Sequence, residues 1–156
     1  MKKILVYAAG TVLLVFAALQ FTNPPRVNPP VAPGHDLCAS NPPPREVAAL
    51  LHRACYDCHS YETQWPWYSH IAPISWTVAG DVHDGRQQLN FSEWPRDDQE
   101  RLQKRMKKIG RDVESGDMPL AKYTWMHPEA RLNAAEREKL SQWAKQEEER
   151  LGAKEP

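Results

Sequence analysis

Two cysteines and a histidine stand in the order Cys55-Tyr56-Asp57-Cys58-His59, which is the spacing C-x-x-C-H. With this spacing the two thiols can add to the two vinyl groups of one haem, and the histidine can bind the iron through its neutral imidazole. One turn of chain then places both sulfurs at the porphyrin edge and the imidazole below its centre. The motif predicts covalent attachment of one haem c to Cys55 and Cys58, with His59 as the proximal iron ligand.

The same cysteines allow two other interpretations. A structural zinc site needs four protein ligands in a compact arrangement, and Cys38 and the other five histidines form no second closely spaced pair. A redox dithiol is typical of a βαβ context with a strand before the motif, and neither is indicated. We therefore favour haem attachment, and a non-haem metal or thiol protein stays open as an alternative.

The sixth coordination position of the iron is the next chemical question. Met118 follows an expected helix end at residues 115–116, Pro119 stiffens its loop, and it stands 59 residues after His59. Met118 is therefore the favoured sixth ligand, and Met/His ligation would leave no open position for a substrate, which favours electron transfer. An open sixth position stays possible, as do four other side chains: Met126, His70, His83 and His127.

Aromatic side chains follow the motif closely. Because large flat side chains pack well against a flat apolar macrocycle, we expect Trp65, Trp67 and Tyr68 to line the haem pocket. A more specific hypothesis is that an indole N–H or the Tyr68 hydroxyl donates a hydrogen bond to a haem propionate. Arg86 could pair with a propionate too, although an exposed arginine is the simpler interpretation.

An uncharged apolar run over residues 4–21 follows Lys2 and Lys3. Its length is near the lower limit for a helix that spans a bilayer, and the two lysines favour a cytoplasmic N-terminus. Residues 1–22 are therefore expected to anchor the chain in a bacterial inner membrane, with the soluble domain in the periplasm. Residues 21–24 make a poor cleavage site, so we favour the anchor over a cleaved signal peptide, which would leave a periplasmic protein.

Eight prolines lie within residues 23–44. This composition favours extended polyproline II, so the segment is predicted to be a tether that holds the domain up to roughly 60 Å from the membrane. A packed irregular lead-in is the alternative. Cys38 is the odd cysteine of the chain, so we expect either a free thiol or a disulfide-linked dimer through this residue.

The chain of 156 residues has a length typical of one domain, which we assign to residues 45–151. It carries 20 basic and 20 acidic side chains, and removal of residues 1–22 takes away only Lys2 and Lys3, so the soluble part has a net charge near −2. The sequence shows no basic stripe and no glycine-rich phosphate loop, so no nucleic-acid partner is expected.

Apolar periodicity predicts an all-α domain. A first helix over 47–54 leads into the motif, and a second spans 74–88. A third has Pro95 in its first turn and an apolar face along 102–113. The last helix begins at Asn133. No segment alternates like a strand.

Three details of these helices are specific enough to check. Asn133 and Glu136 have the spacing of a capping box. Met106 lies on the apolar face of the third helix, so it is expected in the core rather than at the iron. Residues 145–150 are expected to be a solvated run of charges after a short apolar face that holds Leu140 and Trp143.

Five short stretches carry a resemblance to a known family. They are residues 54–60, 62–68 with the run W-P-W-Y, 90–94, 117–119, and 127–132 with the run H-P-E-A. Over about residues 45–145 the chain resembles the small bacterial haem-binding domain family of single-haem, c-type cytochrome-like proteins. The resemblance implies haem binding in a small cytochrome c-like helical fold, and it leaves the electron-transfer partners unassigned.

Together these features predict a membrane-tethered periplasmic c-type haem protein that acts in electron transfer. It would be an electron carrier rather than an enzyme, and its redox partner protein is unknown. The alternative is a haem-based sensor or a peroxidase-like subunit, which requires an open sixth position. A two-haem peroxidase would also need a second C-x-x-C-H, and the chain has one.

Overall fold

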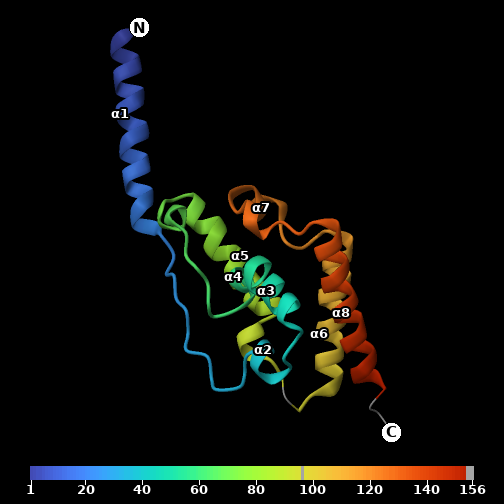
Figure 1. The fold of residues 1–156 in the computed structure, drawn as a ribbon. Coiled ribbons are helices and arrows are strands. Elements are labelled where there is room, and N and C mark those ends of the chain that lie inside the picture. The colour runs from blue at the N-terminus through green and yellow to red at the C-terminus, as the bar shows by residue number, and fades with distance from the viewer. Residues whose placement is uncertain (96, 154–156) are drawn as a thin grey trace.

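The computed structural model describes residues 1–95 and 97–153, and these residues form helices and no strands, which confirms the all-α prediction (Figure 1). The α-helices in chain order are α1 (Lys2–Leu19), α2 (Leu37–Ser40), α3 (Arg45–Ala54), α4 (Tyr56–His59), α5 (Ile74–Gln88), α6 (Gln99–Ser115), α7 (Ala121–Met126) and α8 (Ala134–Gly152). The short 3-10 turns are η1 (Gln20–Thr22), η2 (Trp67–His70), η3 (Phe91–Glu93) and η4 (Pro128–Ala130).

All four predicted helices of the domain are present, as α3, α5, α6 and α8. The start of α6 differs from the prediction, because Asp98 caps this helix and its side chain accepts a hydrogen bond from the Arg101 backbone N–H. A carboxylate that satisfies a free N–H makes a strong helix start, so Pro95 lies before the helix rather than in its first turn. Gly116 ends α6 in the left-handed conformation, with φ of 85°, which glycine adopts without a steric penalty.

The core lies between the α6–α8 hairpin and the helices α3 and α4, to which η3 adds its aromatic side chains. Met106 is fully buried, as predicted, and Leu151 is buried too because α8 continues through the run of charges. The buried apolar side chains of this cluster are Leu37, Val47, Leu50, Leu51, Ala54, Tyr56, Leu89, Phe91, Trp94, Met106, Ile109, Val113, Leu132, Leu140, Trp143, Ala144 and Leu151.

The proline-rich residues 23–44 lie along the domain, as Figure 1 shows for the blue segment between α1 and α2. The Asn28 side chain donates to the Thr63 carbonyl at 2.9 Å, and the backbone N–H of Trp94 donates to the His35 carbonyl at 2.7 Å. Leu37 is fully buried in the core. Because these groups have partners on the domain, the segment is the packed lead-in rather than a free tether, and the long reach does not apply.

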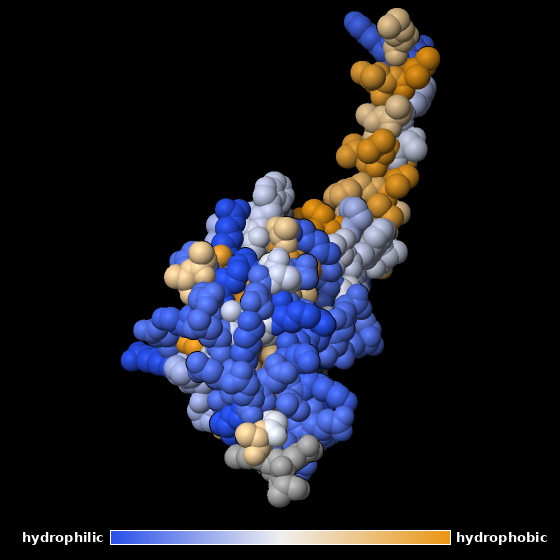
Figure 2. Space-filling model, turned by 90° about the vertical axis from the view of Figure 1, so that its right-hand side faces the viewer, coloured by the Kyte–Doolittle hydropathy of each residue, from blue (hydrophilic) through white to orange (hydrophobic). Residues whose placement is uncertain are grey.

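Helix α1 projects away from the domain as an apolar rod above a mostly hydrophilic body (Figure 2). The stretch Lys2–Thr22 has a mean hydropathy of 2.2, and none of it is buried. By length and composition it can cross a membrane. Among the described residues it is the one helix that can.

The capping box at the start of α8 yields a stability prediction. The Asn133 side chain accepts a hydrogen bond from the Glu136 N–H, and the Glu136 carboxylate accepts one from the Asn133 N–H, both at 2.9 Å. Asn133→Ala should lower the free energy of unfolding by about 1 kcal/mol, measured by urea denaturation. Asn133→Ser, which keeps a capping oxygen, should stay close to wild type, and equal losses in the two variants would contradict the capping role.

Candidate functional site

Helix α3 delivers the C-x-x-C-H motif into a single tight turn. Its apolar face is buried, which fixes the helix on the core. The Cys55 carbonyl then accepts the N–H groups of Cys58, at 3.2 Å, and His59, at 3.0 Å, and α4 forms. The three chemically active side chains are thereby held on one short turn, as the spacing predicts.

The ring of His59 is oriented by the C-terminal end of α5. Its Nδ1 atom lies 3.0 Å from the Gly85 carbonyl and 2.9 Å from the Leu89 carbonyl. Because a carbonyl oxygen only accepts hydrogen bonds, Nδ1 must carry the hydrogen, and the lone pair lies on Nε2. Burial lowers the pKa of His59, against smaller opposing effects of the two carbonyls. The ring is therefore in its neutral form, which is the form that can bind a metal.

Gly85 makes this arrangement possible, because α5 passes very close to the motif at this residue. A Cβ atom added here would lie 2.5 Å from the Cys58 carbonyl oxygen, which real structures do not tolerate. Sequence reasoning missed this role. The signal was present, because Gly85 continues the Val78 and Val82 face of α5 toward Leu89.

The two motif cysteines are free thiols in this structure. Burial is the main cause that raises the pKa of Cys55 and of Cys58 to about 12 each. Both thiols are therefore protonated at neutral pH, whereas a redox dithiol depends on a thiolate stabilised by a lowered pKa. Within residues 1–95 and 97–153, no group of three or more His, Cys, Asp and Glu side chains is placed to hold a metal ion.

A cavity of about 240 Å³ brings Cys55, Cys58 and His59 together with Met118. An adjoining cavity of about 40 Å³ shares Cys55, His59 and Met118. Its other lining residues include the apolar Leu89, Phe91, Ile109 and Val113 and the charged Lys108 and Asp112. Most ligand sites measure about 300–1,000 Å³, so a haem would extend beyond this cavity or displace the loop of Met118. The donor chemistry fits the group, because two thiols, an imidazole and a thioether line one cavity, although Asp81, Asp84 and Lys122 line it too.

Met118 reaches the cavity from a loop that is held at both ends. Its N–H donates to the Asp112 carbonyl at 2.9 Å. The Arg137 guanidinium on α8 donates to the Val113 carbonyl at 2.6 Å and lies 3.5 Å from the Met118 carbonyl. Arg137 therefore positions this loop, a role that no sequence pattern signalled.

The structure separates the aromatic residues that were expected to line the haem pocket. None of the three lines the cavity around His59. The Trp65 indole N–H donates to the Asn28 side chain at 3.1 Å, and Trp67 is 71% exposed. Trp67 and Tyr68 instead line a separate apolar groove that also includes Cys58. Sequence proximity to the motif thus does not place these rings in the cavity around His59, and their contact with a haem stays a prediction.

Arg86 makes four hydrogen bonds within the protein itself. Its guanidinium donates to the carbonyls of Ser60, at 2.8 Å, and Val27, at 2.9 Å, and to the side chains of Asn28 and Thr63, both at 3.0 Å. The residue therefore ties the lead-in to the chain that leaves the motif, and its pairing with a propionate stays a prediction.

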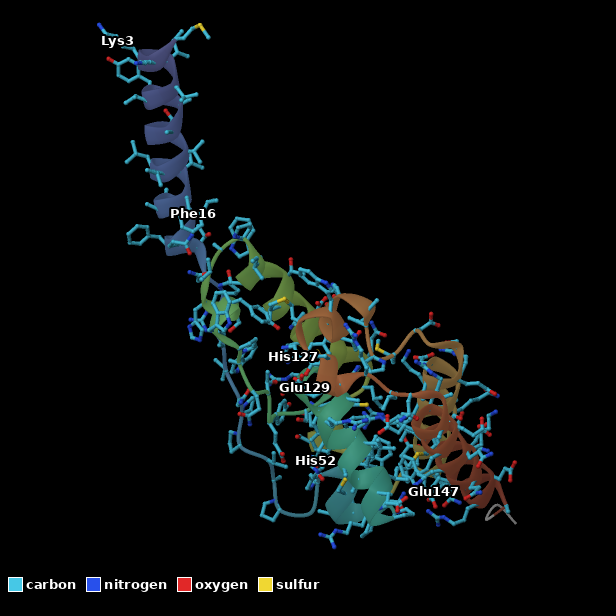
Figure 3. All side chains as sticks on the ribbon, turned by 45° about the horizontal axis from the view of Figure 1, so that its top comes forward. Lys3, Phe16, His52, His127, Glu129 and Glu147 are labelled. Carbon is cyan, nitrogen blue, oxygen red and sulfur yellow. The ribbon has the colours of Figure 1, made fainter. Side chains whose placement is uncertain are left out.

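The W-P-W-Y and H-P-E-A stretches meet through a chain of hydrogen bonds. The Tyr68 hydroxyl lies 2.6 Å from His127 Nε2, and His127 Nδ1 lies 2.9 Å from the Glu129 carboxylate (Figure 3). Tyr123 stacks on His127 with ring centroids 4.5 Å apart, and its hydroxyl donates to Asp57 at 2.6 Å. Residues distant in sequence thus hold the middle of the C-x-x-C-H motif from outside.

These features define an all-α domain built around a C-x-x-C-H turn with an oriented histidine. The family model of the haem-binding domain matches residues 14–146. The chain therefore belongs to the haem-binding domain family, and the match extends past the resemblance into the lead-in and Cys38. No curated protein and no solved structure matches the chain.

The close approach at Gly85 predicts a site-specific defect. Gly85→Ala should push α5 away from the motif, break the His59 hydrogen bonds and reduce the haem content per chain, with a lower melting temperature. Gly80→Ala is the matched control on the same helix, because a Cβ there meets nothing within 4 Å, and it should hold haem normally. Haem content is measured by pyridine haemochrome assay. Equal haem loading in both variants would disprove the role of Gly85.

Proposed function

We propose that this protein is a c-type haem protein that carries electrons, with one haem bound covalently through Cys55 and Cys58. The observation that carries the proposal is the orientation of His59, whose Nδ1 is held by two carbonyls and whose Nε2 is left for iron. Metal-binding histidines usually have such a partner on the second nitrogen. A zinc site or an activated dithiol has no comparable support in this geometry.

Met118 is the proposed sixth ligand because it lines the same cavity as His59. Met126 lines the groove beyond Cys58 instead. Both ring nitrogens of His127 are engaged, by Tyr68 and Glu129, and His83 bonds Gln87 on the exposed side of α5. A thioether on one side and an imidazole on the other would close the iron to substrates.

Haem, when bound, supplies the one-electron redox chemistry. The chain has three tasks around it. The cysteines hold the macrocycle, and the end of α5 fixes the plane of the His59 ring. Leu89, Phe91 and Val113, which are buried beside the cavity, would help to keep water from a bound haem, and a dry, apolar shell is one of the ways a protein tunes a haem potential.

Covalent attachment can be tested directly. Protein made with a c-type maturation system should gain the mass of one haem, and the haem should stay on the chain after acid-acetone extraction. Cys55→Ala and Cys58→Ala should each weaken or abolish the attachment, whereas Cys38→Ala should keep the full haem content. Full release of haem from the wild type would disprove the thioether bonds. Non-reducing electrophoresis of the same samples tests the proposed dimer through Cys38.

Sixth-ligand exchange tests the electron-carrier function. Met118→Ala should open the iron to carbon monoxide, lower the reduction potential and remove the far-red sulfur-to-iron absorption band, because a soft thioether favours ferrous iron. Met126→Ala is the matched control and should change none of the three. If the wild type already binds carbon monoxide rapidly and Met118→Ala changes nothing, the sensor or peroxidase-like function would take precedence.

We also propose that α1 anchors the domain to the outer face of a bacterial inner membrane. The support is its length, its hydropathy and the absence of buried residues along it, and the proposal places Lys2 and Lys3 on the cytoplasmic side. The wild type should stay in the membrane fraction after carbonate extraction, and protease added to spheroplasts should digest the domain. Recovery of a soluble mature form that begins near Asn23 would show cleavage instead.

A further inference from the structure

Five large apolar side chains are exposed together around the start of α5 and the end of α7. Their exposed fractions are 71% for Trp67, 50% for Ile74, 42% for Trp76, 76% for Trp125 and 43% for Met126. All but Trp76 line one apolar groove, of about 340 Å³. We call these five residues the tryptophan patch. The face of the domain that Figure 2 shows is mostly hydrophilic, and a cluster of exposed apolar side chains marks a candidate interaction site.

The tryptophan patch is fixed to the end of helix α1. The Gln20 side chain accepts a hydrogen bond from the Ala72 N–H, at 3.0 Å, and donates one to the Ala72 carbonyl, at 3.2 Å. The Trp76 indole N–H donates to the Thr22 carbonyl at 3.1 Å. Figure 1 shows the consequence: the start of α5 and the helix α7 lie at the end of the domain from which α1 projects.

The length of α1 places this junction at a definite depth. The uncharged run over residues 4–21 has 18 residues, and at about 1.5 Å per residue it measures roughly 27 Å. The hydrocarbon core of a bilayer is about 30 Å thick. If α1 spans it, Thr22 lies at the hydrocarbon boundary, and the Trp76 indole bonded to Thr22 lies among the lipid headgroups. Tryptophan is enriched at this depth because its ring is apolar and its N–H is polar.

We propose that the tryptophan patch docks on the lipid headgroup layer next to α1, which holds the domain flat on the membrane. The proposal rests on the membrane anchoring proposed above. Lipid is the occupant that the geometry favours, because the patch is continuous with a helix of membrane-spanning length. Formal charge does not oppose this contact, since Lys122 beside the groove is paired with Asp81 at 2.7 Å.

The docked orientation has a consequence for the haem. Cys58 lines the same groove as Trp67, Trp125 and Met126. The thioether at Cys58 would therefore be the part of the haem attachment that lies nearest the bilayer. Such a domain would exchange electrons at the membrane surface rather than at the end of a long tether.

The docking can be tested on the full holoprotein in nanodiscs of phosphatidylcholine and phosphatidylglycerol. The protein is labelled with 5-fluorotryptophan, reduced, and observed by fluorine NMR, with signals assigned by Trp67→Phe, Trp125→Phe and Trp65→Phe. A lipid that carries a nitroxide on its headgroup should broaden the Trp67 and Trp125 signals strongly. A water-soluble gadolinium chelate should broaden them weakly. Trp65, which bonds Asn28 outside the patch, is the control and should show less of the lipid effect.

The outcomes separate the docking from the anchoring. A chain that does not co-purify with the nanodiscs would refute the membrane anchor, and with it the docking. A chain that co-purifies but whose Trp67 and Trp125 signals respond to the soluble chelate and not to the lipid nitroxide would refute the docking alone. Protection from both probes would also refute it, because a protein surface and not lipid would then cover the patch.

Discussion

The hydrogen bonds from His59 Nδ1 to the Gly85 and Leu89 carbonyls are the interaction on which the rest of the site depends. They determine which ring nitrogen is free and in which direction it points. They require α5 to end at Gln88 and to pass the motif so closely that Gly85 can bear no side chain. This contact therefore constrains α4 and α5 at once.

A second set of contacts stabilises the motif from the opposite side. Asp57, between the two cysteines, is held by the Tyr123 hydroxyl and by the Gln64 N–H. Tyr123 stacks on His127, which connects Tyr68 to Glu129. Polar networks of this kind are worth most when every member has a partner. Here the network makes the two family-specific stretches parts of one support for the C-x-x-C-H turn.

The sequence predicted the elements whose signals are local and could not predict the contacts that depend on direction. The bounds of α5, the capping box of α8 and the burial of Met106 all follow from periodicity or from short-range hydrogen bonds, and each is confirmed. Helix α7 has too few residues to show a period. The burial of Leu37 and the guanidinium bonds of Arg86 required knowledge of where the lead-in runs, which no local pattern encodes.

The order of the parts along the chain determines the order in which they can form. The C-x-x-C-H turn lies at residues 55–59, whereas α5 and the α6–α8 hairpin that orient and enclose it all follow later. If α1 keeps its N-terminus in the cytoplasm and the residues after it cross the membrane in chain order, the cysteines would reach the far side before the helices that bury them. The thiols would then be accessible for haem attachment during an early interval. Folding of the C-terminal half around His59 would then bury the thiols and end this interval.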